Sequence, residues 1–129
     1  MTAPANLEGL RVLVVEDDML IALHIEGTLH NLGCVVIGPV GKLEAAITAA
    51  AGEAIDLAIL NINIRGGHVY PVAERLRERG IPFVLVSGYG DWALPEAFRN
   101  QPRLTKPFSV WELEAQVRLL CTRPGMLPA

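Results

Sequence analysis

Short apolar runs rich in β-branched residues alternate five times with longer segments of helical period, and this alternation limits the possible folds more than any other sequence feature. The runs cover residues 10–15, 34–38, 56–61, 82–87 and 103–105. Most are nearly continuous in apolar character, which is typical of strands buried on both faces of a parallel sheet. Strand–helix units in series predict an α/β fold with right-handed crossovers.

The segments between these runs have the spacing and the capping residues of amphipathic helices. The expected helices begin after Asp17 and Asp18, cover 42–51 and 70–79, and begin again at a cap formed by Ser109. Pro95 limits any helix within 91–98 to a turn or two. The sequence therefore predicts a doubly wound, flavodoxin-like, five-stranded parallel sheet in the order 2-1-3-4-5, with a short or irregular fourth helix.

The composition agrees with one domain that builds a buried core. The chain has 129 residues, of which 51% are hydrophobic, and it carries 11 Lys and Arg against 14 Asp and Glu. The resulting formal net charge of −3 gives no basic field that would attract nucleic acid or an anionic membrane. We expect a single domain over residues 1–129, with a core over about 9–121 and flexible termini.

Cysteine content and hydropathy bear on the compartment. Cys34 and Cys121 are too few for a disulfide framework and lie in no Cys/His cluster, so we interpret both as buried thiols in a reducing environment. No apolar run approaches the roughly 20 residues that a membrane-spanning helix needs, and no secretory signal follows the polar N-terminus. We therefore expect a cytoplasmic protein with neither a membrane nor a nucleic acid as partner.

Polar side chains gather where four of the predicted strands end, at the edge where doubly wound sheets bind ligands. They are Glu16 and Asp17 after the first strand, Asn61 and Asn63 after the third, Ser87 at the end of the fourth, and Lys106 after the fifth. Adjacent carboxylates with amide and backbone oxygens suit a hard ion such as Mg²⁺. A hydroxyl and an ammonium group suit phosphoryl oxygens. Each residue alone fits a helix cap or a solvated loop, whereas the set in this order indicates a site.

Four stretches of the chain resemble the receiver domain of two-component response regulators. They are Val-Leu-Val-Val-Glu-Asp-Asp at 12–18, Leu-Ala-Ile-Leu-Asn-Ile-Asn-Ile-Arg-Gly-Gly at 57–67, Val-Ser-Gly at 86–88 and Lys-Pro-Phe at 106–108. The resemblance implies a phosphorylation switch in a phosphorelay, and so a signalling module rather than an enzyme. It implies a histidine kinase or phosphotransfer protein as upstream partner and another protein downstream.

The resemblance also implies a role for each polar residue at the edge. Glu16 and Asp17 would hold Mg²⁺, with Asp17 as the direct ligand, and the backbone carbonyl of Asn63 would complete the metal site. Lys106 would neutralise the phosphoryl charge. Ser87 would swing to hydrogen-bond a phosphoryl oxygen and relay the modification outward.

The phosphoacceptor position departs from the family pattern, because Asn61 stands where receivers carry an aspartate. A neutral amide is a far weaker nucleophile than a carboxylate and cannot form the ordinary acyl phosphate. The exchange also removes one negative charge from the metal site, which weakens Mg²⁺ binding. The sequence predicts a receiver that is phosphorylation-silent as written. One alternative is a phosphorylation-independent interaction module that uses the 91–121 face. Another is a small phosphate or nucleotide binder. Asn61 itself fits either a natural pseudo-receiver or an experimental variant.

The segment after the fourth strand departs as well. Receivers often carry an aromatic residue three positions before the lysine, and here that position is Arg103. Tyr89 is a candidate for the mobile switch aromatic, with a plain surface aromatic as the alternative. We interpret Arg75, Arg77 and Arg79 as a solvated helix face, and we expect Trp111 to be partly buried.

Overall fold

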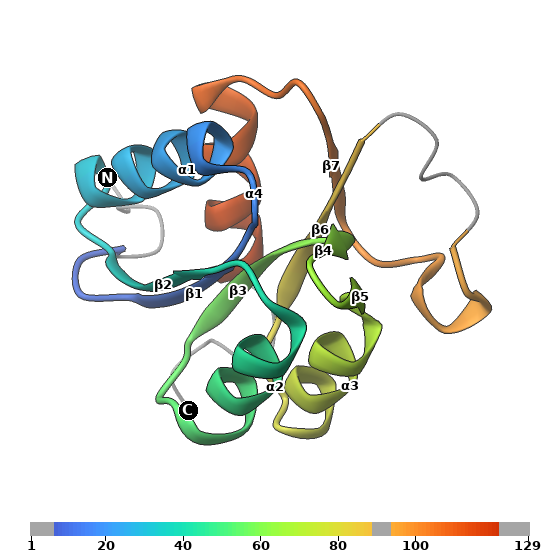
Figure 1. Ribbon diagram of the computed structural model, residues 1–129. Coiled ribbons are helices and arrows are strands. Elements are labelled where there is room, and N and C mark those ends of the chain that lie inside the picture. Colours follow the sequence, from blue (N-terminus) through green and yellow to red (C-terminus); the bar gives the residue numbers. More distant parts are fainter. Residues whose placement is uncertain (1–6, 89–93, 122–129) are drawn as a thin grey trace.

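A computed structural model describes residues 7–88 and 94–121, so that the switch candidate Tyr89 lies outside the described residues. A five-stranded parallel sheet forms the centre of the molecule, in the order β2-β1-β3-β6-β7 (Figure 1). Its strands are β1 Arg11–Val15, β2 Val35–Val40, β3 Leu57–Asn61, β6 Phe83–Ser87 and β7 Arg103–Thr105. Counted within this sheet alone the order is 2-1-3-4-5, which confirms the predicted topology.

Helices cover both faces of the sheet. Figure 1 shows α1 (Met19–Asn31) and α4 (Val110–Cys121) on one side, and α2 (Leu43–Gly52) and α3 (Tyr70–Glu78) on the other. Successive side chains of β1 and β3 alternate between the two resulting cores, so that Leu13 and Ala58 pack toward α2 and α3 while Val12 and Leu57 pack toward α1 and α4. This double burial explains why the strand segments of the sequence are continuously apolar.

Side-chain caps fix where two helices begin, as the sequence predicts. Asp18 Oδ1 accepts hydrogen bonds from the backbone N–H groups of Leu20 at 3.0 Å and Ile21 at 3.2 Å, so that α1 starts directly after Asp18. Ser109 Oγ accepts from the N–H of Glu112 at 3.1 Å, and Glu112 Oε1 accepts from the N–H of Ser109 at 2.9 Å, a reciprocal capping box at the start of α4.

The second strand is longer than the sequence predicts. The Gly38–Pro39 pair is a local stop signal, but β2 continues to Val40 through a shift of register against β1 between Leu13 and Val15. Gly38 has a φ of 104°, and a Cβ at this position would lie 2.8 Å from both Val14 O and Val40 N. The irregularity lets Val40 O accept a hydrogen bond from Glu16 N at 2.9 Å, so it helps to place the first residue of the polar edge.

The segment after β3 folds back on itself in a small antiparallel pair, β4 (Asn63–Ile64) and β5 (Gly67–His68). Of the predicted irregular fourth helix, residues 94–98 are described, and they contain one turn of 3₁₀ helix, η1 (Glu96–Phe98). Phe98 stacks on Tyr70 with 5.2 Å between ring centroids, which fixes this turn against α3.

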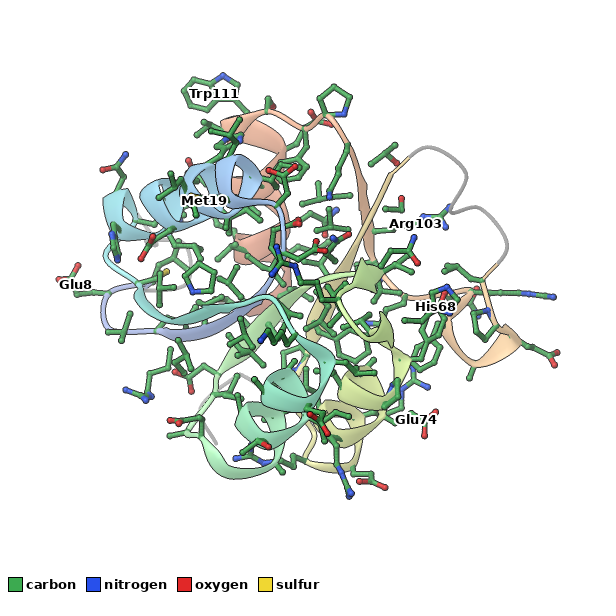
Figure 2. All side chains as sticks on the ribbon, in the orientation of Figure 1. Glu8, Met19, His68, Glu74, Arg103 and Trp111 are labelled. Atoms are coloured by element: carbon green, nitrogen blue, oxygen red, sulfur yellow. The ribbon has the colours of Figure 1, made fainter. Side chains whose placement is uncertain are left out.

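Of two expectations about surface side chains, one is confirmed and one is wrong. Arg75, Arg77 and Arg79 are exposed as predicted, but the Arg77 guanidinium also lies 4.5 Å above the Phe98 ring, and Arg79 donates to the carbonyls of α2 and its C-cap. The expectation of partial burial was wrong for Trp111, which is 78% exposed and projects from the start of α4 (Figure 2).

In the described ranges, no helix combines the length and apolar character that crossing a membrane requires.

Candidate functional site

The carboxyl edge of the sheet brings together the residues that the sequence singles out. Glu16 and Asp17 leave β1, Asn61 ends β3, Ser87 ends β6 and Lys106 follows β7. Because β1 and β3 are hydrogen-bonded neighbours in parallel register, Glu16 and Asp17, the acidic pair, emerge beside Asn61. The β4 turn then brings the backbone of Asn63 against the Asn61 side chain.

The Asn61 amide lies at the centre of this group and is only 4% exposed. Its Nδ2 atom donates to Glu16 Oε2 at 3.0 Å and to Asn63 O at 2.8 Å, and it lies 3.3 Å from Asp17 Oδ1. The two carboxylates and the backbone carbonyl are the acceptors that the sequence predicts to gather around a cation. In this structure they surround the amide nitrogen.

Glu16 is buried and ionically paired. Its side chain is fully inaccessible, and Oε1 lies 3.2 Å from the Nζ atom of Lys106, outside good hydrogen-bond geometry but within ion-pair distance. Oε2 accepts a second hydrogen bond, from the N–H of Asp18 at 3.0 Å. Burial raises the pKa of the Glu16 carboxyl, an effect that the Asp18 N–H and Lys106 oppose and that the nearby Asp17 charge reinforces.

Ser87 is buried at the same edge but is turned toward the sheet. Its Oγ donates to Leu104 O at 3.5 Å, a long hydrogen bond to the neighbouring strand β7. The structure thus brings Glu16, Asp17, Asn61, Lys106 and the Asn63 carbonyl into contact, while the Ser87 hydroxyl is engaged with backbone.

The donor set, as it is arranged, does not fit a divalent metal ion. Mg²⁺ prefers carboxylate and carbonyl oxygens, and Glu16, Asp17 and Asn63 supply them. One oxygen of each group, however, faces the Asn61 amide nitrogen, and the other Glu16 oxygen lies 3.2 Å from the Nζ atom of Lys106. Within residues 7–88 and 94–121, no group of three or more His, Cys, Asp or Glu residues could hold a metal.

Two surface features beside the edge were not predicted. A groove of about 650 Å³ runs between α1 and the β2–α2 connection, and Asp17, Leu23 and Lys42 are among its lining residues. On α1, Met19, Leu20 and Leu23 are 75%, 79% and 57% exposed. The signal was present in the sequence, because α1 has apolar residues on more than the one stripe that a surface helix needs.

Comparisons with known proteins agree with the topology. The chain matches no protein-family model. It is 29% identical over 119 residues to the two-component response regulator PhoP of Pseudomonas aeruginosa, covering 88% of this chain and 52% of that protein. It is 31% identical over 117 residues to the probable transcriptional regulator ycf27 of Cyanophora paradoxa, covering 88% of this chain and 48% of the relative. The chain spans about half the length of the curated relatives it matches.

Solved structures match over most of their length. SdrG from Sphingomonas melonis Fr1 is 36% identical, with a TM-score of 0.79 over 88% of this chain and 98% of that one. A response regulator receiver protein from Sinorhizobium medicae is 28% identical, with a TM-score of 0.75 over 88% and 95% of the two chains. The PA1611 receiver domain from Pseudomonas aeruginosa, solved with a magnesium ion in its active-site cleft, shares the fold at 22% identity, a TM-score of 0.70, and coverage of 88% and 95%.

The sheet topology and these relatives define the class of protein as a two-component signalling domain. Within that class, the chain belongs to the family of response-regulator receiver domains. Phosphorylation and magnesium binding are typical of this family.

Proposed function

We propose that this chain is a receiver that cannot accept a phosphoryl group at its own acceptor position, Asn61. The observation that carries the proposal is the placement of the Asn61 amide at the end of β3, among Glu16, Asp17 and the Asn63 carbonyl. An amide attacks phosphorus far more weakly than a carboxylate does, and here its nitrogen is already engaged as a donor.

The remaining edge residues keep the chemistry that a phosphoryl group requires. We assign to Lys106 the neutralisation of phosphoryl charge, supported by its position 3.2 Å from Glu16. We assign to Ser87 a hydrogen bond to a phosphoryl oxygen, which requires its hydroxyl to turn away from Leu104. Tyr89 stays a candidate switch residue on the sequence alone.

Magnesium binding at this edge is proposed to be weak. Glu16, Asp17, Asn61 and Asn63 are the residues that would hold the ion, but the Asn61 amide must first turn its nitrogen away from the other oxygens. Once the amide had turned, a bound ion would supply positive charge for phosphoryl oxygens.

Beryllofluoride tests the site, because it binds carboxylates as a phosphoryl analogue. We expect ¹⁹F NMR with Mg²⁺ to show a bound species for Asn61→Asp and only free beryllofluoride for the unchanged chain. Asn63→Asp is the matched control, since it makes the same exchange two residues away, and it should also stay unbound. Binding to the unchanged chain, or none to a folded Asn61→Asp, would contradict the proposal.

The rival reading is an interaction module that works without phosphorylation through the 91–121 face. The specific observation in its favour is the exposure of apolar side chains on α4, where Trp111 is 78% and Leu119 54% exposed. The two readings share a protein partner downstream, and the beryllofluoride experiment on Asn61→Asp separates them.

For the upstream partner we propose a histidine kinase or phosphotransfer protein that docks on the α1 surface, defined as Met19, Leu20 and Leu23. These side chains are exposed and apolar, and they lie within six residues of Asp17 in the chain. A partner held there would bring its phosphohistidine to the carboxyl edge of the sheet. Exposed apolar side chains on a helix suit packing against the apolar face of a partner helix.

A further inference from the structure

The Asn61 amide makes contacts that a nucleophile would not need. Its nitrogen has two N–H bonds, and it faces three acceptors: Glu16 Oε2 at 3.0 Å, Asp17 Oδ1 at 3.3 Å and Asn63 O at 2.8 Å. The Asn61 Nδ2 atom, at the end of β3, therefore contacts both the residues that follow β1 and the β4 turn. A cation that bound this edge would join the same three segments through the same oxygens.

The electrostatic cost of the acidic pair explains why such a donor matters. Glu16 is buried with a carboxyl group beside a second carboxylate, an arrangement that costs free energy unless donors or cations compensate it. Three groups do so: the Asp18 N–H, Lys106, and the Asn61 amide. Hydrogen bonds from a neutral amide to an ionised carboxylate are charge-assisted and strong.

An aspartate at this position would add negative charge to the acidic pair where the amide now compensates it. It would replace the donor by a third carboxylate within hydrogen-bond distance of Glu16 and Asp17, and both N–H donors of the Asn61 side chain would be lost. Such a site needs a divalent cation for the compensation that the amide now supplies.

We propose that the Asn61 amide is a built-in substitute for the divalent cation of a receiver site. It holds the acidic pair and the Asn63 carbonyl together by hydrogen bonds, so the edge keeps its arrangement without Mg²⁺. Added Mg²⁺ must displace the amide in order to bind. The inference rests on the proposed function only in that it treats this edge as a receiver site.

Thermal unfolding at pH 8, in EDTA and in millimolar MgCl₂, tests the substitution. The unchanged chain should have the same midpoint in both buffers. Asn61→Asp should unfold at least about 5 °C lower in EDTA, because it loses hydrogen bonds to charged groups and gains a like charge, and MgCl₂ should restore most of the loss. Asn31→Asp makes the same exchange at an exposed position at the end of α1, and Mg²⁺ should leave its midpoint unchanged.

Equal stabilisation of the unchanged chain and Asn61→Asp by Mg²⁺ would overturn the inference. So would an Asn61→Asp variant that is as stable as the unchanged chain in EDTA, or one that Mg²⁺ does not restore. If that variant does not fold, NMR spectra of the unchanged chain during a titration with Mg²⁺ test the inference instead. The Asn61 side-chain N–H signals should keep their positions as Mg²⁺ is added through the millimolar range, and a shift that saturates below millimolar Mg²⁺ would overturn the inference.

These readouts are independent of phosphoryl chemistry. An Asn61→Asp variant that gains Mg²⁺-dependent stability but takes up no beryllofluoride would support the cation substitute while refuting the proposed receiver site. The converse result, uptake without any change in Mg²⁺-dependent stability, would refute the substitute alone.

Discussion

At the scale of single residues, the exchange of a carboxylate oxygen for an NH₂ group at position 61 changes both chemistry and stability. The amide is a weaker nucleophile than a carboxylate, but it donates hydrogen bonds to acceptors that a carboxylate would repel. Lys106 is the only formal positive charge that the structure records in ion-pair contact with Glu16 in the described part of the chain.

We expect Lys106→Met to destabilise the fold by about 1–3 kcal/mol at pH 7, because it leaves the buried Glu16 carboxylate without its cation. Urea denaturation measures the loss. Lys42→Met, which removes an exposed ammonium group beside the neighbouring groove, should change the free energy of unfolding by less than about 0.5 kcal/mol. Similar losses for both variants would show that the Glu16 pair contributes nothing specific.

The buried thiol of Cys34 predicts a loss of stability at high pH. Burial, with smaller contributions from Cys121 and Glu8, raises the pKa of Cys34 to about 11 from an ordinary value of 9.0. A raised pKa means that the folded chain holds this proton where the unfolded chain releases it. The resulting stability is complete below pH 9 and is lost as the pH rises toward about 11.

The unfolding free energy of the unchanged chain should therefore fall by about 2–3 kcal/mol more than that of Cys34→Ala over this interval. Urea denaturation at a series of pH values gives both curves. Parallel curves for the two proteins would contradict the assignment to Cys34.

At the scale of elements, two glycines should respond to alanine with opposite signs. Gly38 has a φ of 104° and no room for a Cβ, so Gly38→Ala should cost about 1–3 kcal/mol. Gly27 lies within α1, where an added Cβ would meet nothing within 4 Å, so Gly27→Ala should stabilise by about 0.5–1 kcal/mol. Chemical denaturation measures both, and effects of the same sign would contradict the described backbone.

The elements that the sequence predicts well are those whose local pattern and tertiary role agree. The strands at β1, β3, β6 and β7 and the caps at Asp18 and Ser109 follow from apolar runs and capping residues. The end of β2 did not follow, because Gly38–Pro39 is a local stop signal that pairing with β1 overrides. Trp111 was misjudged because the inward stripe of α4 runs through Leu113, Val117 and Leu120, which leaves position 111 outside.

The candidate site was predictable in its membership but not in its hydrogen bonding. Strand order alone brings Glu16, Asp17, Asn61 and Lys106 to one edge. Whether the nitrogen or the oxygen of the Asn61 amide faces the carboxylates depends on how three separate segments place their acceptors, and no sequence pattern encodes that placement.

At the scale of the whole molecule, the α1 surface exposes three large apolar side chains that the hydrophobic cores do not bury. We expect Leu20→Lys and Leu23→Lys to weaken binding of a phosphotransfer partner by roughly tenfold or more, because each places a charge on an apolar contact. Both side chains are exposed, so the midpoint of thermal unfolding should stay nearly unchanged.

Titration calorimetry with the partner measures the affinity, and Leu119→Lys on α4, where the native side chain is 54% exposed, is the matched control for the upstream surface. A larger loss of affinity for Leu119→Lys than for the α1 variants would indicate that the upstream partner docks on α4 and not on α1.

The central claim is that one amide separates this chain from a working receiver, and intact-mass spectrometry tests it most directly. The unchanged chain, Asn61→Asp and Asn63→Asp would each be incubated with Mg²⁺ and a small acyl phosphate. We predict that Asn61→Asp gains the mass of a single phosphoryl group when Mg²⁺ is present and gains none when Mg²⁺ is left out. The other two proteins should show no gain. A phosphoryl gain in the unchanged chain, or none in a folded Asn61→Asp, would contradict the claim.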